Sequence, residues 1–153
     1  MVTILAFAVL SIVVGFIWIC ARDVKATNAA VARIEKEGEL NVDATFRLAP
    51  TGALLIDYSG RKIGLANASF PTHFNQAPLS MGLSISIEFN KILKTSISQL
   101  PGSTMVRVHF SLAEPNFVNG DTYITVSVDA RNKDDVTTLE SALLHAGLIE
   151  APR

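Results

Sequence analysis

The hydrophobic pattern of the chain begins with one unbroken apolar run. Residues 2–21, VTILAFAVLSIVVGFIWICA, carry no charged side chain. At about 1.5 Å of rise per residue, a helix of this length covers roughly 30 Å, the thickness of the hydrocarbon core of a bilayer. The run therefore predicts a transmembrane helix over residues 1–21, with the lipid bilayer as the partner of residues 2–21.

A cleaved signal peptide is the alternative interpretation of this run. Such a peptide has a positive amino-terminal region, a shorter apolar core and small residues at its cleavage site. No Lys or Arg precedes the run, and the bulky Trp18 lies near its end, so a retained segment is favoured. Arg22, Lys25 and Arg33 follow it, and the positive-inside rule then predicts a single-pass membrane protein with its domain in the cytoplasm.

The next segment, residues 22–40, is predicted to be a helical linker that ends near Gly38. Four of its residues stand at the a and d positions of a heptad: Val24, Thr27, Val31 and Ile34. Two interpretations stay open, a solvated spacer, which is favoured, and the stalk of a homodimer. In the apolar run, Ser11 and Gly15 form a small-xxx-small pair. Such a pair can form the seam of a homodimer, but a helix that faces lipid on all sides is the favoured interpretation.

From residue 41 the spacing of apolar residues changes from helical to alternating, and this change marks a domain over residues 41–150. Alternation predicts strands over 43–48, 53–57, 62–66, 83–89, 105–112 and 123–128, and the apolar residues after Ile92 predict one more. Ser59-Gly60 predicts a tight turn that joins two of these strands into a hairpin. The domain is therefore expected to be mostly antiparallel sheet.

The last element returns to helical spacing. Asp134 and Asp135 fall in its first turn, where carboxylates favour the positive end of a helix. Its apolar residues form one stripe: Val136, Leu139, Leu143 and Ala146. Because this stripe must be buried, the predicted fold class is α+β, with a transmembrane helix, a β-sheet or partial barrel, and a C-terminal helix that closes it.

The order of these elements resembles the pleckstrin-homology-like (PH-like) fold, in which seven antiparallel strands are closed at one corner by a C-terminal helix. The segments GALLIDYSGRKIGLA and IEFNKILKTSI resemble the hairpin and the following step in small bacterial PH-like domains. The resemblance covers roughly residues 41–147. It implies docking to lipids or to a protein, and the protein-binding form fits a chain without the Lys and Arg clusters of the lipid-binding members.

The net charge argues against a nucleic acid partner, and the cysteine count excludes an intrachain disulfide. The 13 Lys and Arg residues and 14 Asp and Glu residues give a net charge of −1, whereas nucleic-acid binding needs a basic face. The single cysteine, Cys20, cannot form an intrachain disulfide. We therefore expect no nucleic acid partner.

The sequence contains none of the common catalytic motifs, such as G-x-S-x-G, a Walker loop or H-E-x-x-H. His73, His109 and His145 have no second ligand at metal spacing. Asp57 lies near the predicted hairpin turn, where a turn-stabilising contact is favoured over a catalytic acid. We expect a protein that is not an enzyme and has no metal and no cofactor.

Two groups of residues are candidate binding sites. Residues 67–82 form an irregular segment with aromatic and apolar side chains, which either pin it to the core or present an adhesive surface. The candidates in it are Phe70, Phe74, Leu79 and Met81. Arg61 and Lys62 are the one adjacent basic pair of the domain, either a solvated turn tip or a contact to anionic lipid.

These candidates, together with an open sheet edge that accepts a partner strand, predict the function. It is a membrane-anchored, non-catalytic binding or assembly module that acts at the membrane surface and has a protein partner. The alternative is a structural subunit of a cell-envelope complex, with its domain on the extracytoplasmic side.

Overall fold

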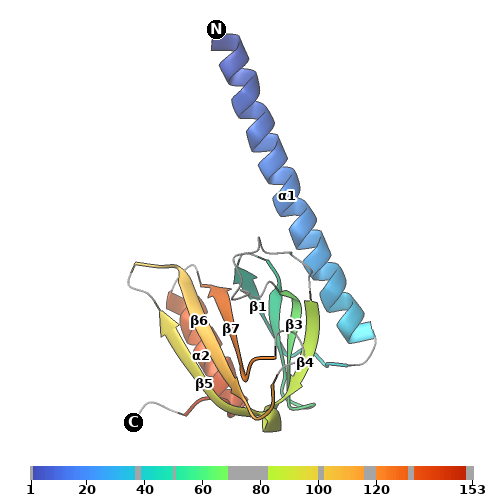
Figure 1. Ribbon diagram of the computed structural model, residues 1–153, viewed down its shortest axis with the longest axis vertical. Coiled ribbons are helices and arrows are strands. Elements are labelled where there is room, and N and C mark those ends of the chain that lie inside the picture. The colour runs from blue at the N-terminus through green and yellow to red at the C-terminus, as the bar shows by residue number, and fades with distance from the viewer. Residues whose placement is uncertain are drawn as a thin grey trace.

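A computed structural model of the protein describes residues 2–36, 39–49, 51–68, 83–99, 102–115, 120–130 and 133–150 (Figure 1). Helix α1 (Val2–Lys36) comes first. The described strands follow: β1 (Ala44–Ala49), β2 (Ala53–Asp57), β3 (Lys62–Ala68), β4 (Leu83–Glu88), β5 (Ile92–Gln99), β6 (Met105–Leu112) and β7 (Tyr123–Asp129). A 3-10 turn, η1 (Phe89–Lys91), joins β4 to β5, and helix α2 (Lys133–His145) is last.

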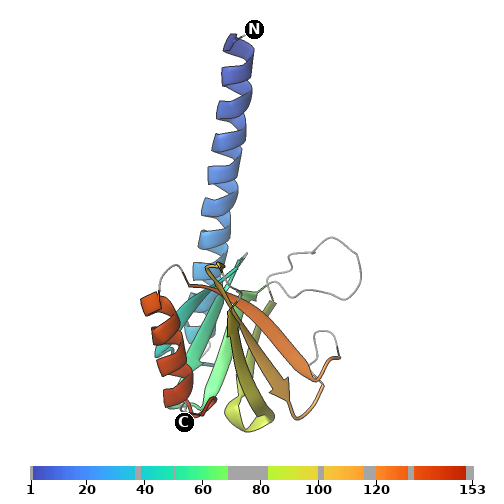
Figure 2. The same cartoon turned by 90° about the vertical axis from the view of Figure 1, so that its left-hand side faces the viewer.

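The described strands form one antiparallel sheet of seven strands in the order β4-β3-β2-β1-β7-β6-β5. Strand β1 pairs first with β2, through residues 44–47, and then with β7, through Leu48 and Ala49. The two edge strands, β4 and β5, are joined by the short η1, so the sheet must curl until its edges meet at one end (Figure 2). The predicted α+β class with a mostly antiparallel sheet is confirmed.

The main core lies inside the curled sheet, because alternate residues of each strand point inward. Strands β6 and β7 bury Val106, Val108, Phe110, Ile124, Val126 and Val128. Helix α2 lies along the open side of the sheet (Figure 2) and adds Leu139 and Leu143, which are fully buried. The predicted apolar stripe of the C-terminal helix is confirmed, with Val136 and Ala146 half-buried at its ends.

Helix α1 runs through residue 21 into the predicted helical linker without a break. It is one continuous helix to Lys36, and Figure 1 shows its amino-terminal part projecting beyond the sheet. Within the described residues, none of the helices is both long enough and apolar enough to cross a membrane. The predictions of a transmembrane helix over residues 1–21 and of a single-pass membrane localisation are therefore wrong. The apolar run is part of a longer helix that continues through Arg22, Lys25 and Arg33.

Candidate functional site

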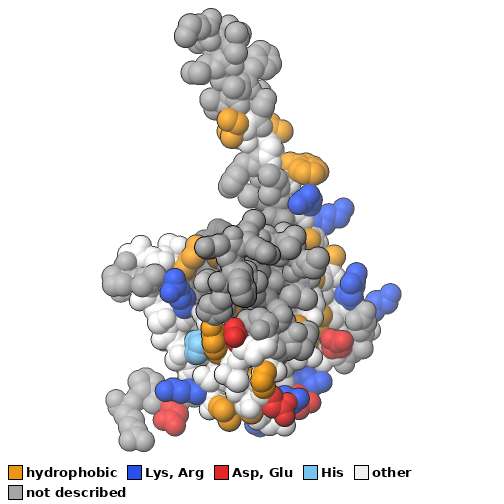
Figure 3. Space-filling model, in the orientation of Figure 1, with side chains coloured by type: hydrophobic (Ala, Val, Ile, Leu, Met, Phe, Trp, Pro, Cys, Tyr) orange, Lys and Arg blue, Asp and Glu red, His pale blue; other side chains and the backbone are white. Residues whose placement is uncertain are grey.

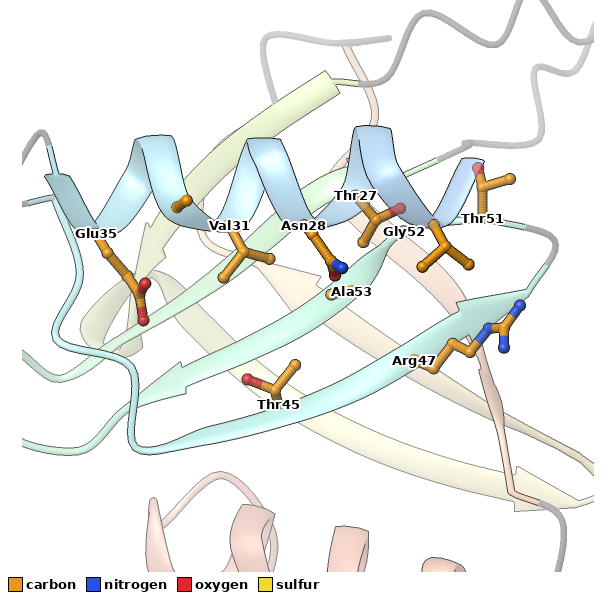
Figure 4. Close-up of a pocket in the computed structure, with 11 residues that line it drawn as sticks. Thr27, Asn28, Val31, Glu35, Thr45, Arg47, Thr51, Gly52 and Ala53 are labelled. Atoms are coloured by element: carbon orange, nitrogen blue, oxygen red, sulfur yellow. The ribbon is translucent and has the colours of Figure 1, made fainter. Parts of the chain in front are cut away.

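A groove lies between the carboxyl-terminal half of α1 and the outer face of β1 and β2 (Figure 4). We call it the helix–sheet groove. Its volume is about 440 Å³. The helix lines it with Val24, Thr27, Asn28, Val31, Ala32 and Glu35, and the sheet with Thr45, Arg47, Thr51, Gly52 and Ala53. A space of this size holds several side chains of another molecule.

The groove exists because the last turns of α1 pack on the outer face of the sheet. Ile34 is 3 % exposed and lies in a small apolar cluster with Leu55 of β2 and Ala66 of β3. Thr27 Oγ1 accepts a hydrogen bond of 3.0 Å from Asn67 Nδ2. The favoured expectation of a solvated spacer over residues 22–40 is therefore wrong for one side of the helix.

A glycine in β3 completes this packing. Leu40 follows α1 and is buried over Gly64, where an added Cβ would overlap Cδ1 of Leu40 and lie 3.3 Å from Cβ of Leu55. The missing side chain lets Leu40 lie close to the sheet. The chain leaving α1 is thereby held against β3, and this contact fixes where the helix ends over the sheet.

Gly52 forms part of the groove floor in a backbone conformation that favours glycine. Its φ is +107°, and an added Cβ would lie 2.7 Å from the carbonyl oxygen of Asn67 and 2.8 Å from that of Ala66. Both neighbours are backbone atoms, which cannot turn aside as a side chain can. The β1–β2 turn therefore approaches β3 this closely only with glycine at position 52.

Gly52→Ala is expected to lower the free energy of unfolding by about 2 kcal/mol, because it combines a strained φ with a backbone overlap. Gly102→Ala is the matched control, since Gly102 also has a positive φ, +75°, but nothing within 4 Å of an added Cβ. Denaturant titration of both variants measures the difference. Equal losses for the two variants would show that the close approach to β3 adds nothing.

Charges of opposite sign flank the groove. Arg47 of β1 and Glu35 of α1 are both exposed, and Figure 4 places them toward opposite ends of the helical segment that lines it. The part between them is formed by Val31, Ala53 and hydroxyl or amide side chains. The arrangement suits an amphipathic peptide segment, with apolar groups in the middle and charged groups at its ends.

Asp57, the last residue of β2, connects the β2–β3 turn to the chain that follows α1. Its carboxylate is 4 % exposed and accepts hydrogen bonds from the N–H of Gly60 at 2.6 Å, the hydroxyl of Ser59 at 2.9 Å and the N–H of Asn41 at 2.9 Å. Burial raises the pKa of Asp57, but these hydrogen bonds and the charge of Lys62 outweigh it and lower the pKa below its ordinary value. The predicted turn-stabilising role is confirmed, because the carboxylate joins the β2–β3 turn to the chain after α1.

The predicted basic pair lies at the β2–β3 turn, outside the residues that line the groove. The exposed Arg61 has its guanidinium carbon 5.8 Å from the ring centroid of Phe89, and its carbonyl accepts the Phe89 N–H at 2.8 Å. Lys62 is half-buried and opposite Asp57 in the β2–β3 ladder. Their predicted role as a binding site is not tested by these contacts.

Lys62 instead lines a second, smaller hollow along the edge strand β4, which we call the edge slot. Its volume is about 340 Å³, and its walls include residues 85–88 of β4, Leu112 at the end of β6, and Lys91. Lys91 Nζ lies 4.0 Å from a carboxylate oxygen of Glu114, with both side chains mostly exposed. The slot is the described counterpart of the open sheet edge predicted from the sequence.

The other candidate binding residues, Phe70, Phe74, Leu79 and Met81, lie outside the described residues, as does His73. The two described histidines make local contacts. His109 Nδ1 lies 2.8 Å from Thr125 Oγ1 and its ring stacks on Tyr123, while His145 meets the ring of Tyr58 edge-on at 4.5 Å. In the described part of the chain, no group of three or more His, Cys, Asp or Glu residues could hold a metal ion.

Sequence reasoning missed the groove and its sheet residues, Thr45 and Arg47. A partial signal was present, because the linker residues Val24 and Val31 already stood at heptad spacing. What was missing is which side of the helix meets the sheet. That depends on the contact of Leu40 with Gly64, which no local pattern contains.

Comparisons of the chain with protein-family models, with curated proteins and with solved structures give no match. The resemblance of residues 41–147 to PH-like domains therefore stays a prediction.

Proposed function

We propose that this protein is a non-catalytic assembly module that holds a segment of a protein partner in the helix–sheet groove. The observation that carries this proposal is the groove itself, an open space of about 440 Å³ built from a helix and a sheet face. Grooves that combine apolar side chains with hydroxyl, amide and charged groups can bind amphipathic segments. The PH-like resemblance, in its protein-binding form, supports the same function.

The rigidity of the groove also supports docking. Its helix wall is fixed by the buried Ile34, and its floor by the glycine at position 52 and the short β1–β2 turn. A preformed site loses less conformational entropy when a partner binds. Residues that line it, such as Ala32, are exposed and therefore free to be replaced without disturbing the core.

Ala32→Glu is expected to reduce the amount of bound partner by about tenfold or more, because the added carboxylate would have to lose its water when the partner's apolar side chains fill the groove. Ala29→Glu is the matched control on the same helix, on the exposed side away from the groove. Each change places its carboxylate four residues before a basic residue, Lys36 or Arg33, so the effects on the helix are similar.

The measurement is co-purification of the full chain under mild conditions, with quantitative mass spectrometry of every bound protein, further copies of the chain included. Circular dichroism checks that both variants keep their helix and sheet content. Recovery of the same proteins in the same amounts with Ala32→Glu and Ala29→Glu would contradict docking in the groove.

A second candidate function, a structural subunit of a larger complex, is favoured by the projecting part of α1. Figure 3 shows hydrophobic side chains at described positions of this part, and Ile12, Ile17 and Trp18 are among the exposed large hydrophobic residues. Exposed apolar surface of this kind is typical of helices that another subunit covers. The two functions share an assembly role and differ in whether the partner covers the groove or the projecting turns.

A further inference from the structure

One stripe of α1 runs from the projecting turns into the helix–sheet groove, and we call it the heptad stripe. Its members alternate in steps of three and four residues: Val14, Ile17, Ala21, Val24, Asn28, Val31 and Glu35. The last four line the groove, and the first three lie farther along the helix. The step pattern is the 3.5-residue repeat of helices that coil around another helix.

The upper part of this stripe is open to solvent. Ile17 is 60 % exposed, Val14 57 % and Val24 45 %. The sheet of the same chain covers the neighbouring side of α1, where Ala30 and Ile34 pack on β2 and β3. A row of large apolar side chains at heptad spacing, beside a side that is already covered, is typical of a helix with a second partner.

We infer that the heptad stripe packs against the same stripe of a second copy of this chain, as a parallel two-stranded coiled coil. This inference rests on the proposed function and names the partner that enters the groove. A heptad repeat is complementary to another heptad repeat, and a two-fold pair lets one surface supply both halves of the contact. The partner's side chains, rather than its whole helix, would fill the 440 Å³ of the groove.

Asn28 argues for a second copy and for its direction. It is the one uncharged polar side chain in the stripe, with Val24 before it and Val31 after it. A lone Asn in an apolar seam is stabilised when the same Asn of a parallel partner faces it, and this pairing fixes a two-stranded register. Glu35 lies at the end of the stripe and is exposed in the single chain.

The antiparallel arrangement is the alternative. In the register that brings Arg47 of one copy toward Glu35 of the other, the two helices overlap mainly over the groove and leave Val14 and Ile17 uncovered. A register centred on Val24 would cover the whole stripe, but it would set Asn28 of one copy against Ala21 of the other, where the Asn has no polar partner. The parallel pair covers the stripe and also brings the two Asn28 side chains together.

Disulfide trapping in the full chain tests this arrangement. In a Cys20→Ala background, which removes the single native cysteine, Val24→Cys lies on the stripe and Ala29→Cys on the exposed side away from it. Facing residues of a parallel seam are within disulfide reach, so we expect Val24→Cys to form covalent dimers at least about tenfold faster than Ala29→Cys. Non-reducing gels of mildly oxidised protein report the rates.

Sedimentation velocity of the full chain is the second measurement. Val24→Glu is expected to shift the chain from dimer to monomer, with the dimer weakened at least about tenfold, while Ala29→Glu stays dimeric. Because Val24 is an exposed side chain, Val24→Glu is expected to fold, and circular dichroism checks this. Equal trapping rates for the two cysteines, or a native chain that sediments as a monomer, would overturn the inference.

Mixtures of two cysteine variants separate the two directions: Val24→Cys with Glu35→Cys for the antiparallel register over the groove, and Ile17→Cys with Val31→Cys for the antiparallel register centred on Val24. Faster trapping between the two variants of either mixture than within either variant alone would overturn the parallel arrangement. The native chain could instead be a monomer that binds a different protein, and Ala32→Glu could abolish that binding. This result would overturn the inference that the partner is a second copy and would leave the proposed function standing. A stripe cross-link that persists while Ala32→Glu changes no association would support the coiled coil and contradict the groove as the docking site.

Discussion

Replacing Asp57 by alanine is expected to lower the free energy of unfolding by about 3 kcal/mol. The buried carboxylate accepts three hydrogen bonds of 2.6 to 2.9 Å, and two of the donors are backbone N–H groups, of Gly60 and Asn41. Alanine would leave these donors without the charged acceptor that joins the β2–β3 turn to the chain after α1. Urea or guanidinium titration at neutral pH measures the loss.

The stability that Asp57 contributes is expected to depend on pH. The pKa of Asp57 is lowered below its ordinary value of 3.8 in the folded protein, so the carboxylate contributes stability that is fully present well above that value. This contribution is lost as the pH falls through 3.8 and then through the lower folded-state pKa. The difference in stability between the native chain and Asp57→Ala should therefore shrink on acidification from neutral pH to below about pH 3.

Asp57→Asn is the control that separates charge from shape. It keeps one acceptor oxygen but turns an NH2 group toward a backbone N–H, so a smaller loss than that of Asp57→Ala is expected at neutral pH. The loss should again shrink on acidification. A difference between the native chain and either variant that stays constant from neutral pH to pH 3 would contradict the role given to the ionised carboxylate.

The sheet and α2 could be predicted from the sequence because their signals are local. Alternation in residues 105–112 and 123–128 follows from one face being buried, and those strands were found with their bounds nearly unchanged. The hairpin between β2 and β3 carries its own turn residues, and Asp57 could be assigned to that turn from its position alone. The stripe of α2 predicts which side it buries, whatever the details of the sheet.

The helix–sheet groove could not be predicted because it depends on contacts between distant residues. Leu40 and Gly64 are far apart in the chain, as are Ile34 and its neighbours in the sheet, and these contacts together place the end of α1 over the sheet. The apolar run at the start of α1 fitted a membrane helix by length and composition, a prediction that proved wrong. Hydropathy measures how apolar a helix is and contains no information on the sheet that packs against its later turns.

The buried side of α1 leads to the last prediction. Ile34→Ala is expected to weaken the docking of the last turns of α1 on the sheet by about 3 kcal/mol. This loss is in the range found when a buried isoleucine is truncated and a cavity remains. Ile34 contributes to a cluster with Leu55 and Ala66 that is separate from the main core inside the sheet. The loss should therefore be local, with α1 released while the sheet stays folded.

Hydrogen exchange resolved along the chain measures this release. Amides of α1 from residue 24 to 36 should lose protection in Ile34→Ala, whereas amides of β6 and β7 should keep theirs. Leu143→Ala is the contrasting variant, because Leu143 is fully buried in the main core and its truncation should lower the protection of the whole sheet. Since the groove needs a docked helix, Ile34→Ala should also lose the partner that Ala32→Glu loses. Unchanged protection in α1 would show that Ile34 does not hold the helix on the sheet, and the groove would then need another support.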